Sequence, residues 1–184
     1  LALGRGRAGT PGVLADLGAR LGFTVSIAAT READGEVVRS SLIHRVISEG
    51  DVSRAAALLG RRYRVEGRVV RGDGRGRSIG VPTANVAVAD QLLVPGHGVY
   101  AVNFFEGGHR WAGAANVGTR HTFDGVGRTL EVHLLDFAGD LYDKPCEVEF
   151  VERLRPEQRF GSVGDLVNQI HRDVEDARRI LGGA

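Results

Sequence analysis

The sequence predicts a mainly β domain, an antiparallel barrel or sandwich, followed by one C-terminal helix and preceded by a partial α/β segment. Apolar and polar residues alternate from Tyr63 to Val69, a period of two that is typical of strands. Glycine-rich breaks then separate further strand-like runs at 99–105, 111–117, 129–137 and 146–151. Several short strands joined by glycine turns favour a barrel or a sandwich.

The last segment of the chain predicts a single amphipathic helix. Ser162 occupies the N-cap position, and Asp165 lies three residues further on, which is the spacing of a capping box. Apolar residues then recur at helical spacing as far as Leu181, where glycines end the helix. We expect this helix to pack on the β domain.

Residues 1–60 carry the signals of α/β structure. A helix is expected after Thr10-Pro11, which supply an N-cap and a proline in the first turn. A short strand over 23–28 and two helices after Ser40, each ended by a glycine, complete the segment. The segment lacks the several parallel strands that an α/β sheet needs, so we expect it to be the end of a larger domain.

Composition narrows the classes of partner. The net charge of +1 over 184 residues gives no overall field for nucleic acid or an anionic membrane, and no apolar run could span a bilayer. The single cysteine, Cys146, excludes an internal disulfide and fits a reducing compartment. We therefore expect a cytoplasmic protein that binds neither nucleic acid nor membrane. The lack of methionine and the start at Leu1 indicate a fragment of a longer chain.

A loop rich in glycine and arginine follows the first predicted strand of the β domain. Its glycines allow backbone N–H groups to approach a polyphosphate closely, and its arginines add positive charge. The spacing matches neither a Walker A loop nor a dinucleotide-binding fingerprint. A long hairpin loop with solvated arginines explains the residues equally well. The candidate ATP-binding residues of the loop are Gly72, Gly74, Arg75, Gly76, Arg77 and Gly80.

The next segment, Pro82-Thr83-Ala84-Asn85, is a candidate metal and ATP site. The Thr83 hydroxyl and the Asn85 amide lie two residues apart, so both point to the same face of an extended chain. Two neutral oxygens suit a Mg²⁺ ion that keeps water ligands and takes its charge balance from nucleotide phosphates. Taken alone, the two residues are explained more simply as the polar groups of a turn.

Glu131 is the candidate catalytic residue. It lies on a predicted strand with apolar residues on the opposite face, and a carboxylate in such surroundings can act as a general base. His133 shares its face, and we interpret His133 as a solvent-facing side chain. Asp136 lies at the end of the strand, where a cap or turn role is the simpler interpretation.

Together and in order, these segments resemble bacterial riboflavin kinase from about Tyr63 to Leu181. The resemblance implies a six-stranded antiparallel Greek-key barrel with the C-terminal helix against it. It also implies transfer of the γ-phosphoryl group of ATP to the 5′-hydroxyl of riboflavin, which gives FMN and ADP. The matching segments are Gly74–Arg77 with Gly80–Asn85, Gly98–Ala101, Ala115–Thr119, Leu130–His133, Asp140–Tyr142, Leu154–Glu157 and Phe160 through Arg178.

The resemblance also implies roles for the residues above. The glycine-rich loop holds the ATP phosphates, Thr83 and Asn85 hold Mg²⁺, and Glu131 accepts the proton of the ribityl hydroxyl. The segment 140–142 contributes to the nucleotide or flavin loops, and Asp143 stands where the family often has glycine. The residues expected to bind riboflavin are Asn116, Gly118, Thr119, Arg120, Arg155 and Phe160.

Residues 1–60 resemble the end of the FMN adenylyltransferase domain that precedes the kinase in bifunctional FAD synthetases, and residues 61–184 resemble the kinase domain. The adenylyltransferase motif His-x-Gly-His is absent, and His44 replaces an arginine of that family. We therefore expect FMN formation without FAD synthesis by this chain. The alternatives are one part of a bifunctional enzyme whose adenylyltransferase site is missing here, and a non-catalytic flavin-binding regulatory protein.

Overall fold

A computed structural model of the chain describes residues 6, 9–26, 29–33, 35–72, 74, 76, 79–122 and 125–182. The chain divides into two compact units, residues 1–38 and residues 39–184. No helix in these described ranges is long and apolar enough to cross a bilayer.

The first unit contains helix α1 (Pro11–Leu21) and a ribbon of two short antiparallel strands, β1 (Glu32–Ala33) and β2 (Glu36–Val37). Helix α1 begins as predicted, because the Thr10 hydroxyl accepts a hydrogen bond from the Val13 N–H at 3.4 Å. The strand predicted over 23–28 is wrong for residues 23–26, which are irregular, and residues 27–28 lie outside the described residues.

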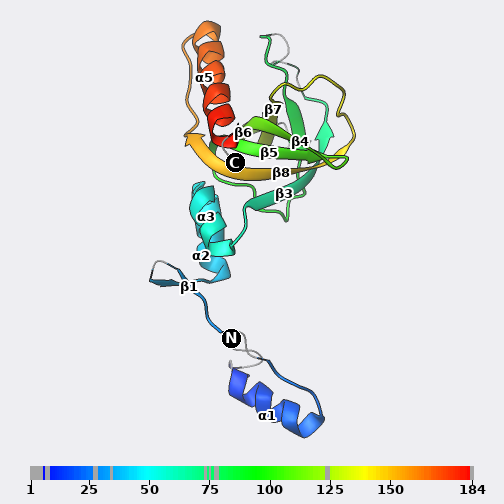
Figure 1. The fold of residues 1–184 in the computed structure, drawn as a ribbon, viewed down its shortest axis with the longest axis vertical. Coiled ribbons are helices and arrows are strands. Elements are labelled where there is room, and N and C mark those ends of the chain that lie inside the picture. Colours follow the sequence, from blue (N-terminus) through cyan, green and yellow to red (C-terminus); the bar gives the residue numbers. More distant parts are fainter. Residues whose placement is uncertain are drawn as a thin grey trace. The chain divides into compact units, whose positions relative to one another are not determined.

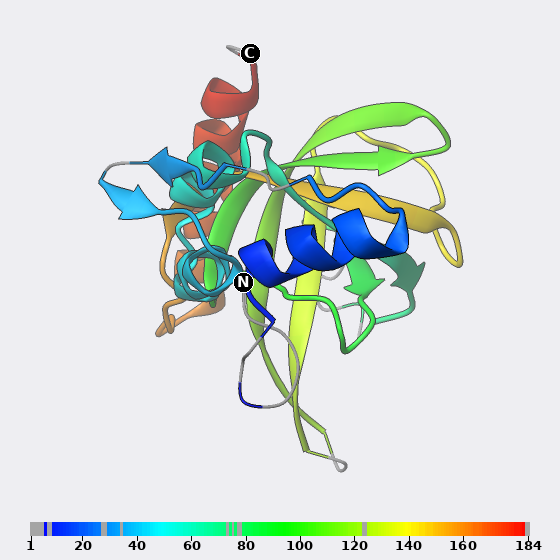
Figure 2. The same cartoon turned by 90° about the horizontal axis from the view of Figure 1, so that it is seen from below.

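The second unit is a closed antiparallel barrel with helices around it (Figures 1 and 2). In the described part of the chain, the six barrel strands follow the spatial order β3-β4-β7-β6-β5-β8. The predicted six-stranded barrel is thereby confirmed, and so is the C-terminal helix. The elements are α2 (Ser40–Glu49), α3 (Val52–Leu59), β3 (Tyr63–Val70), β4 (Ala84–Ala87), β5 (Gly98–Glu106), β6 (His109–Thr122), β7 (Gly125–Leu134), β8 (Pro145–Arg155) and α5 (Val163–Gly182).

Large side chains fill the inside of the barrel. The rings of Tyr100 and Phe150 meet edge to face at 5.3 Å between centroids, and both residues are fully buried together with Phe104. The alternation predicted on β3 is confirmed, because Val65 and Val69 are buried in this core. A filled interior leaves no room for a ligand, so a binding site of this barrel must lie on its outside or at its ends.

Helix α5 packs on the outer face of the barrel. Its buried Ala177 and Leu181 contact Ala101 of β5 and Ala114 of β6, small residues that let the helix come close. Ser162 caps the helix as predicted, since the Asp165 N–H donates to the Ser162 hydroxyl at 3.1 Å and that hydroxyl donates to the Asp165 carboxylate at 2.8 Å.

The turn after β7 joins the barrel to the same helix. Asp136 has a φ of 55°, which confirms its turn role, and its carboxylate accepts hydrogen bonds from the Arg178 guanidinium of α5 at 2.6 and 2.9 Å. These hydrogen bonds lower the pKa of the Asp136 carboxyl. The turn is thereby tied to the end of α5.

Helices α2 and α3 pack against the barrel and belong to the same compact unit. Val52 is fully buried and joins the barrel core, and the Ser53 hydroxyl donates to the Val151 carbonyl of β8. Gly50 joins the two helices with a φ of 85°, and a side chain there would collide with the Tyr100 hydroxyl. The domain boundary expected near residue 60 is based on the families that residues 1–60 and 61–184 resemble, and it stays a prediction.

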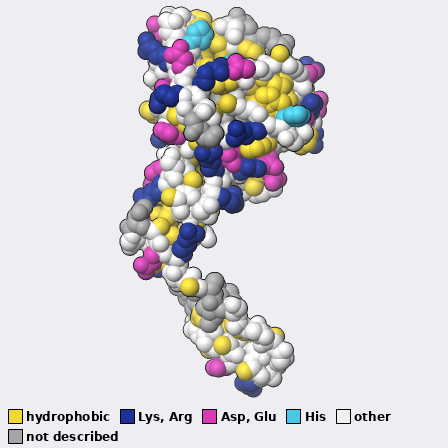
Figure 3. Space-filling model, viewed as in Figure 1, with side chains coloured by type: hydrophobic (Ala, Val, Ile, Leu, Met, Phe, Trp, Pro, Cys, Tyr) yellow, Lys and Arg dark blue, Asp and Glu magenta, His cyan; other side chains and the backbone are white. Residues whose placement is uncertain are grey.

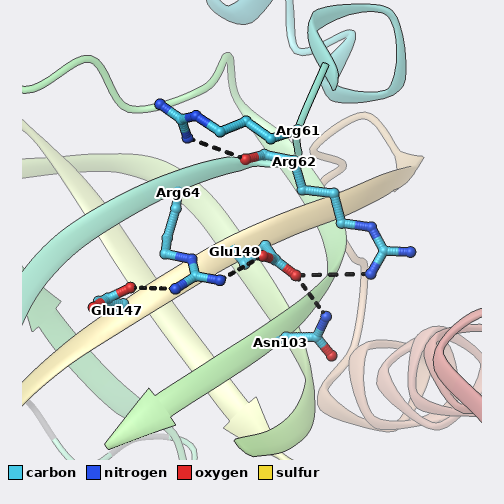
Figure 4. A network of polar contacts seen from close by, with 6 residues as sticks. All are labelled: Arg61, Arg62, Arg64, Asn103, Glu147 and Glu149. Atoms are coloured by element: carbon cyan, nitrogen blue, oxygen red, sulfur yellow. Dashed lines mark hydrogen bonds and ion pairs between the residues drawn. The ribbon is translucent and has the colours of Figure 1, made fainter. Parts of the chain in front are cut away.

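The outer face of strands β3, β8 and β5 carries a polar network (Figure 4). Arg64 donates to Glu147 at 2.6 Å and to Glu149 at 2.7 Å, while the Asn103 amide donates to Glu149 at 2.9 Å. Burial alone would raise the pKa of the Glu149 carboxyl, but the hydrogen bonds from Arg64 and Asn103 outweigh it and lower that pKa. The network therefore stabilises the ionised carboxylate and ties three strands together.

We expect a chain of residues 39–184 to be more stable than a chain of residues 61–184, because the shorter chain lacks Val52 and uncovers the barrel beneath α3. Burying one valine side chain contributes about 1.5–3 kcal/mol, so the free energy of unfolding should fall by at least about 2 kcal/mol. Urea denaturation of both chains measures the difference. Equal midpoints would show that the barrel does not depend on these helices.

We expect Glu149→Gln to lower the free energy of unfolding by about 1–3 kcal/mol at neutral pH, because the variant loses two charge-assisted hydrogen bonds. The pKa of Glu149 is lower in the folded chain than its ordinary value of 4.5, so its stabilising effect is present above that value and is lost as the pH falls below it. The difference between wild type and variant should therefore shrink in acid. The more exposed Glu147→Gln is the control, at less than about 1 kcal/mol. A difference independent of pH would contradict the role of the Glu149 charge.

Candidate active site

One row of residues crosses five neighbouring strands of the barrel. Asn85 of β4 lies opposite Glu131 of β7, and Glu131 lies opposite Asn116 of β6. Asn116 lies opposite Val99 of β5, which lies opposite Arg155 of β8. Residues directly opposite each other in antiparallel strands point to the same face. The sheet therefore brings four residues that the sequence singled out onto one face.

This face is the outside of the barrel. The residues next to the row, Val132, Ala115 and Tyr100, are fully buried in the core. Because side chains alternate along a strand, their neighbours Glu131, Asn116 and Val99 point outward.

A pocket of about 330 Å³ lies over this row, between the barrel and α5. It brings together six residues that the sequence analysis singled out: Gly76, Thr83, Asn116, Glu131, Arg155 and Phe160. Of the remaining residues expected to bind riboflavin, Gly118 and Thr119 lie on β6 outside the lining, and the side chain of Arg120 lies outside the described part of the structure. The other lining residues are Ile79, Val81, Val99, Ala114, Ala115, Glu157, Gln158, Leu166, Ile170 and Asp173.

The glycine-rich loop lies directly against the candidate metal ligands. A Cβ at Gly72 would overlap the Asn85 amide, so any other residue at this position would have to displace that amide. The Val81 N–H donates to the Gly76 carbonyl at 2.8 Å, which closes the end of the loop beside Thr83. Gly74 and Gly80 are described and have φ values of 70° and 79°. Arg75 and Arg77 lie outside the described residues.

Thr83 lies at the boundary between two pockets. It lines the pocket that contains Glu131 and also a second pocket of about 550 Å³ on the other side. The Arg71 guanidinium of this second pocket lies 4.5 Å from the centre of the Tyr142 ring. The segment 140–142 therefore belongs to the second pocket, and Thr83 is the side chain that both pockets share. The remaining lining residues of this second pocket are Val69, Pro82, Ala84, Leu134, Phe137, Ala138, Gly139, Asp140 and Leu141.

Two local features near these pockets concern residues that the sequence analysis discussed, His133 and Asp143. The His133 ring is partly exposed on the outer face of the barrel, and its Nδ1 also lies 2.8 Å from the Pro82 carbonyl oxygen. Asp143 has a φ of 60°, in the region that favours glycine. This conformation explains why glycine suits the position.

The neutral oxygens of Thr83 and Asn85 remain the candidate ligands of a metal ion. Within the described residues, no group of three or more His, Cys, Asp or Glu side chains could hold an ion. A hydroxyl and an amide fit Mg²⁺ only where a ligand supplies negative charge, as a polyphosphate does. The donor set therefore fits a metal that arrives with a nucleotide.

Asp173 of α5 is a pocket residue that the sequence analysis missed. Asp173 is 4% exposed, and its carboxylate accepts two hydrogen bonds from the Arg155 guanidinium, at 2.9 and 2.7 Å. Gln169 donates to the same carboxylate at 3.0 Å, and Arg155 lies 5.8 Å from the centre of the Phe160 ring. The sequence offered one sign of this buried pair: Asp173 is an acidic residue between Ile170 and Ala177, on the apolar stripe of the helix.

Gly118 lies beside two side chains that line the first pocket. A Cβ at Gly118 would lie 2.8 Å from the Glu157 carboxylate and 3.3 Å from the Asn116 amide, so a larger residue there would have to displace the Glu157 side chain. Thr119 is exposed. The long β6–β7 hairpin that carries these residues projects beyond the barrel (Figure 2).

Comparisons with known proteins give a consistent result. The family model described as Flavokinase, riboflavin kinase, matches residues 59–181. A bifunctional riboflavin kinase/FMN adenylyltransferase of Pseudomonas fluorescens is 45% identical over 175 residues, which are 95% of this chain and 56% of the relative. The protein of the same description from Escherichia coli K12 is 40% identical over 180 residues, 97% of this chain and 57% of the relative. The chain spans about half the length of the curated relatives it matches.

A solved structure shares the fold. A crystal structure described as a macrolide-efflux protein from Streptococcus pneumoniae superposes with a TM-score of 0.86 at 33% identity. The similarity covers 97% of this chain and 57% of that protein. That description concerns the other protein, and we take only the fold from this comparison.

We expect Asp173→Asn to lower the free energy of unfolding by about 3–5 kcal/mol, because it leaves the charge of Arg155 without its buried partner. The control is Asp176→Asn on the same helix, whose exposed pair with Arg179 should contribute less than about 1 kcal/mol. Chemical denaturation of both variants checks the comparison. Similar losses in the two variants would contradict a special role of the buried pair.

Proposed function

The chain belongs to the riboflavin kinase family, whose model matches residues 59–181, and we propose that it transfers the γ-phosphoryl group of ATP to the 5′-hydroxyl of riboflavin in the pocket over Glu131. One observation carries this proposal. Glu131 lies opposite Asn85 on one side and Asn116 on the other, so the candidate base stands between the nucleotide side and the flavin side of the row.

Thr83 and Gly76 favour binding of the nucleotide phosphates at the boundary between the two pockets. Both line the pocket with Glu131, and Thr83 also reaches the second pocket. The nucleoside would then extend into the second pocket, past the Tyr142 ring. Thr83 and Asn85 would hold a Mg²⁺ ion, which neutralises phosphate charge when bound. The loop from Gly72 to Gly80 would supply backbone N–H donors to the phosphates.

The pocket over Glu131 suits a flat ring with a polar chain. Its walls include the apolar side chains of Ile79, Leu166 and Ile170, with Phe160 at one side. Asn116 and Arg155 supply polar groups at the row itself. We infer that the flavin ring lies between α5 and the barrel and that the ribityl chain points toward Glu131. Gly118, Thr119 and Arg120 would border the ring from β6.

Glu131 would accept the proton of the 5′-hydroxyl as the hydroxyl oxygen attacks the γ-phosphorus. The new oxygen–phosphorus bond forms while the bond from the γ-phosphorus to the bridging oxygen breaks, and ADP leaves with that oxygen. Phosphoryl transfer depends mainly on alignment and charge neutralisation, so holding the two substrates on one rigid face is the main contribution of the fold.

We propose that the protein works in the cytoplasm, without nucleic acid or membrane. The face in Figure 3 supports this, because basic and acidic side chains are interspersed over the barrel. Burial raises the pKa of the Cys146 thiol to about 11, so the thiol stays protonated at neutral pH.

Since the relatives are longer, the chain corresponds to the kinase part of a bifunctional enzyme in this proposal. Adenylyl transfer would need residues outside it.

The direct test is FMN formation from riboflavin and Mg-ATP, measured for wild type and for Glu131→Gln. The glutamine keeps the shape of the side chain but cannot take a proton, so turnover should fall by about 10²–10⁴-fold with both substrates still bound. Asp136→Asn, which alters the nearby turn outside the pocket, is the control and should keep its turnover. Flavin binding without FMN formation by wild type would favour the non-catalytic alternative.

A further inference from the structure

The hydrogen bond between His133 and Pro82 has a defined direction. Nδ1 of the His133 ring lies 2.8 Å from the Pro82 carbonyl oxygen. A carbonyl oxygen can only accept, so Nδ1 carries the hydrogen and His133 is the donor. The Pro82 carbonyl and the Thr83 N–H belong to one planar peptide group. His133 therefore fixes the orientation of the peptide plane that carries Thr83.

The backbone cannot fix this plane by strand pairing alone. The pairing of β4 with β7 begins at Ala84 opposite Val132. One step earlier, Thr83 would stand opposite His133, so the Pro82–Thr83 peptide lies just outside the paired residues of the two strands. The His133 side chain supplies a donor at the point where the backbone ladder stops.

Packing gives Thr83 little support either, because pockets lie on both sides of it. Tight packing holds most buried side chains in one place, but Thr83 is only partly buried and lines both pockets, so close packing does not surround its side chain. Its hydroxyl therefore depends on the orientation of its backbone.

We propose that His133 is a positioning residue for the nucleotide: it holds the Pro82–Thr83 peptide so that the Thr83 hydroxyl stays in place for the metal and the phosphates of ATP. This inference rests on the proposed function. His133 acts through Thr83 and touches neither the reacting atoms nor the flavin side of the row. A misplacement of about 1 Å in a reacting arrangement can cost about 10²-fold in rate.

Substitutions of His133 that differ in the position of the donor nitrogen give a matched set of variants. Asparagine carries an amide nitrogen at the same number of bonds from the backbone as Nδ1, so His133→Asn keeps a donor for the Pro82 carbonyl. Glutamine moves that nitrogen one bond further out, and alanine removes it. We expect kcat/KM for Mg-ATP to fall about 10- to 100-fold in His133→Ala and His133→Gln and to recover in His133→Asn, while the KM for riboflavin stays unchanged in all three.

A double-variant cycle with Thr83→Ala tests whether His133 acts through Thr83. If it does, adding His133→Ala to Thr83→Ala should cause little further loss for Mg-ATP. Thermal unfolding of every variant shows whether it is folded, and if the alanine variant is not, the asparagine and glutamine pair carries the comparison. Losses that multiply in the double variant would overturn the inference, and so would an asparagine variant as impaired as the glutamine variant.

The same measurements separate this inference from the proposed function. If Thr83→Ala leaves the use of Mg-ATP unchanged, the assignment of Thr83 to the nucleotide fails, and the inference about His133 fails with it. If Thr83→Ala is impaired while His133→Ala is normal, only the role of His133 is contradicted.

Discussion

The register between β4, β7 and β6 is the constraint on which the candidate site depends. It places Asn85, Glu131 and Asn116 side by side on the outer face of the barrel. A slip of one residue on β7 would turn Glu131 into the core and Val132 out toward solvent. The burial of Val132 therefore enforces the register that aligns the polar row. Burial of apolar surface inside the barrel and alignment of the proposed catalytic groups outside it are two results of one strand pairing.

A barrel with a filled interior can build a pocket only by adding walls to its outside. Helix α5 supplies one wall, with Leu166 and Ile170 facing the pocket and Ala177 and Leu181 anchoring the helix to the strands. The ion pair between Arg155 and Asp173 crosses from β8 to this helix. It ties the wall to the row, so stability and the proposed binding of substrate depend on the same residues.

The sequence was sufficient for features that depend on local periodicity and short motifs. Alternation on β3 predicted the burial of Val65 and Val69, and the capping box predicted the start of α5. Glu131 and Thr83 were proposed as site residues from their chemistry and from the motifs of a family. The contact of His133 with Pro82 and the pair of Arg155 with Asp173 join residues 51 and 18 positions apart. Such contacts depend on the tertiary fold and leave little trace in local sequence patterns. The acidic Asp173 on the apolar stripe of its helix was one sign of the pair with Arg155.

The central claim is that both substrates meet at one outer face of the barrel, with Glu131 between them. A crystal structure with riboflavin, Mg²⁺ and a non-hydrolysable ATP analogue tests it most directly. We expect the riboflavin 5′-oxygen within hydrogen-bonding distance of the Glu131 carboxylate, about 2.6–3.2 Å, and the terminal phosphate beside the Thr83 hydroxyl. A flavin ring lying in the pocket beside Tyr142, with its 5′-oxygen away from Glu131, would contradict the account.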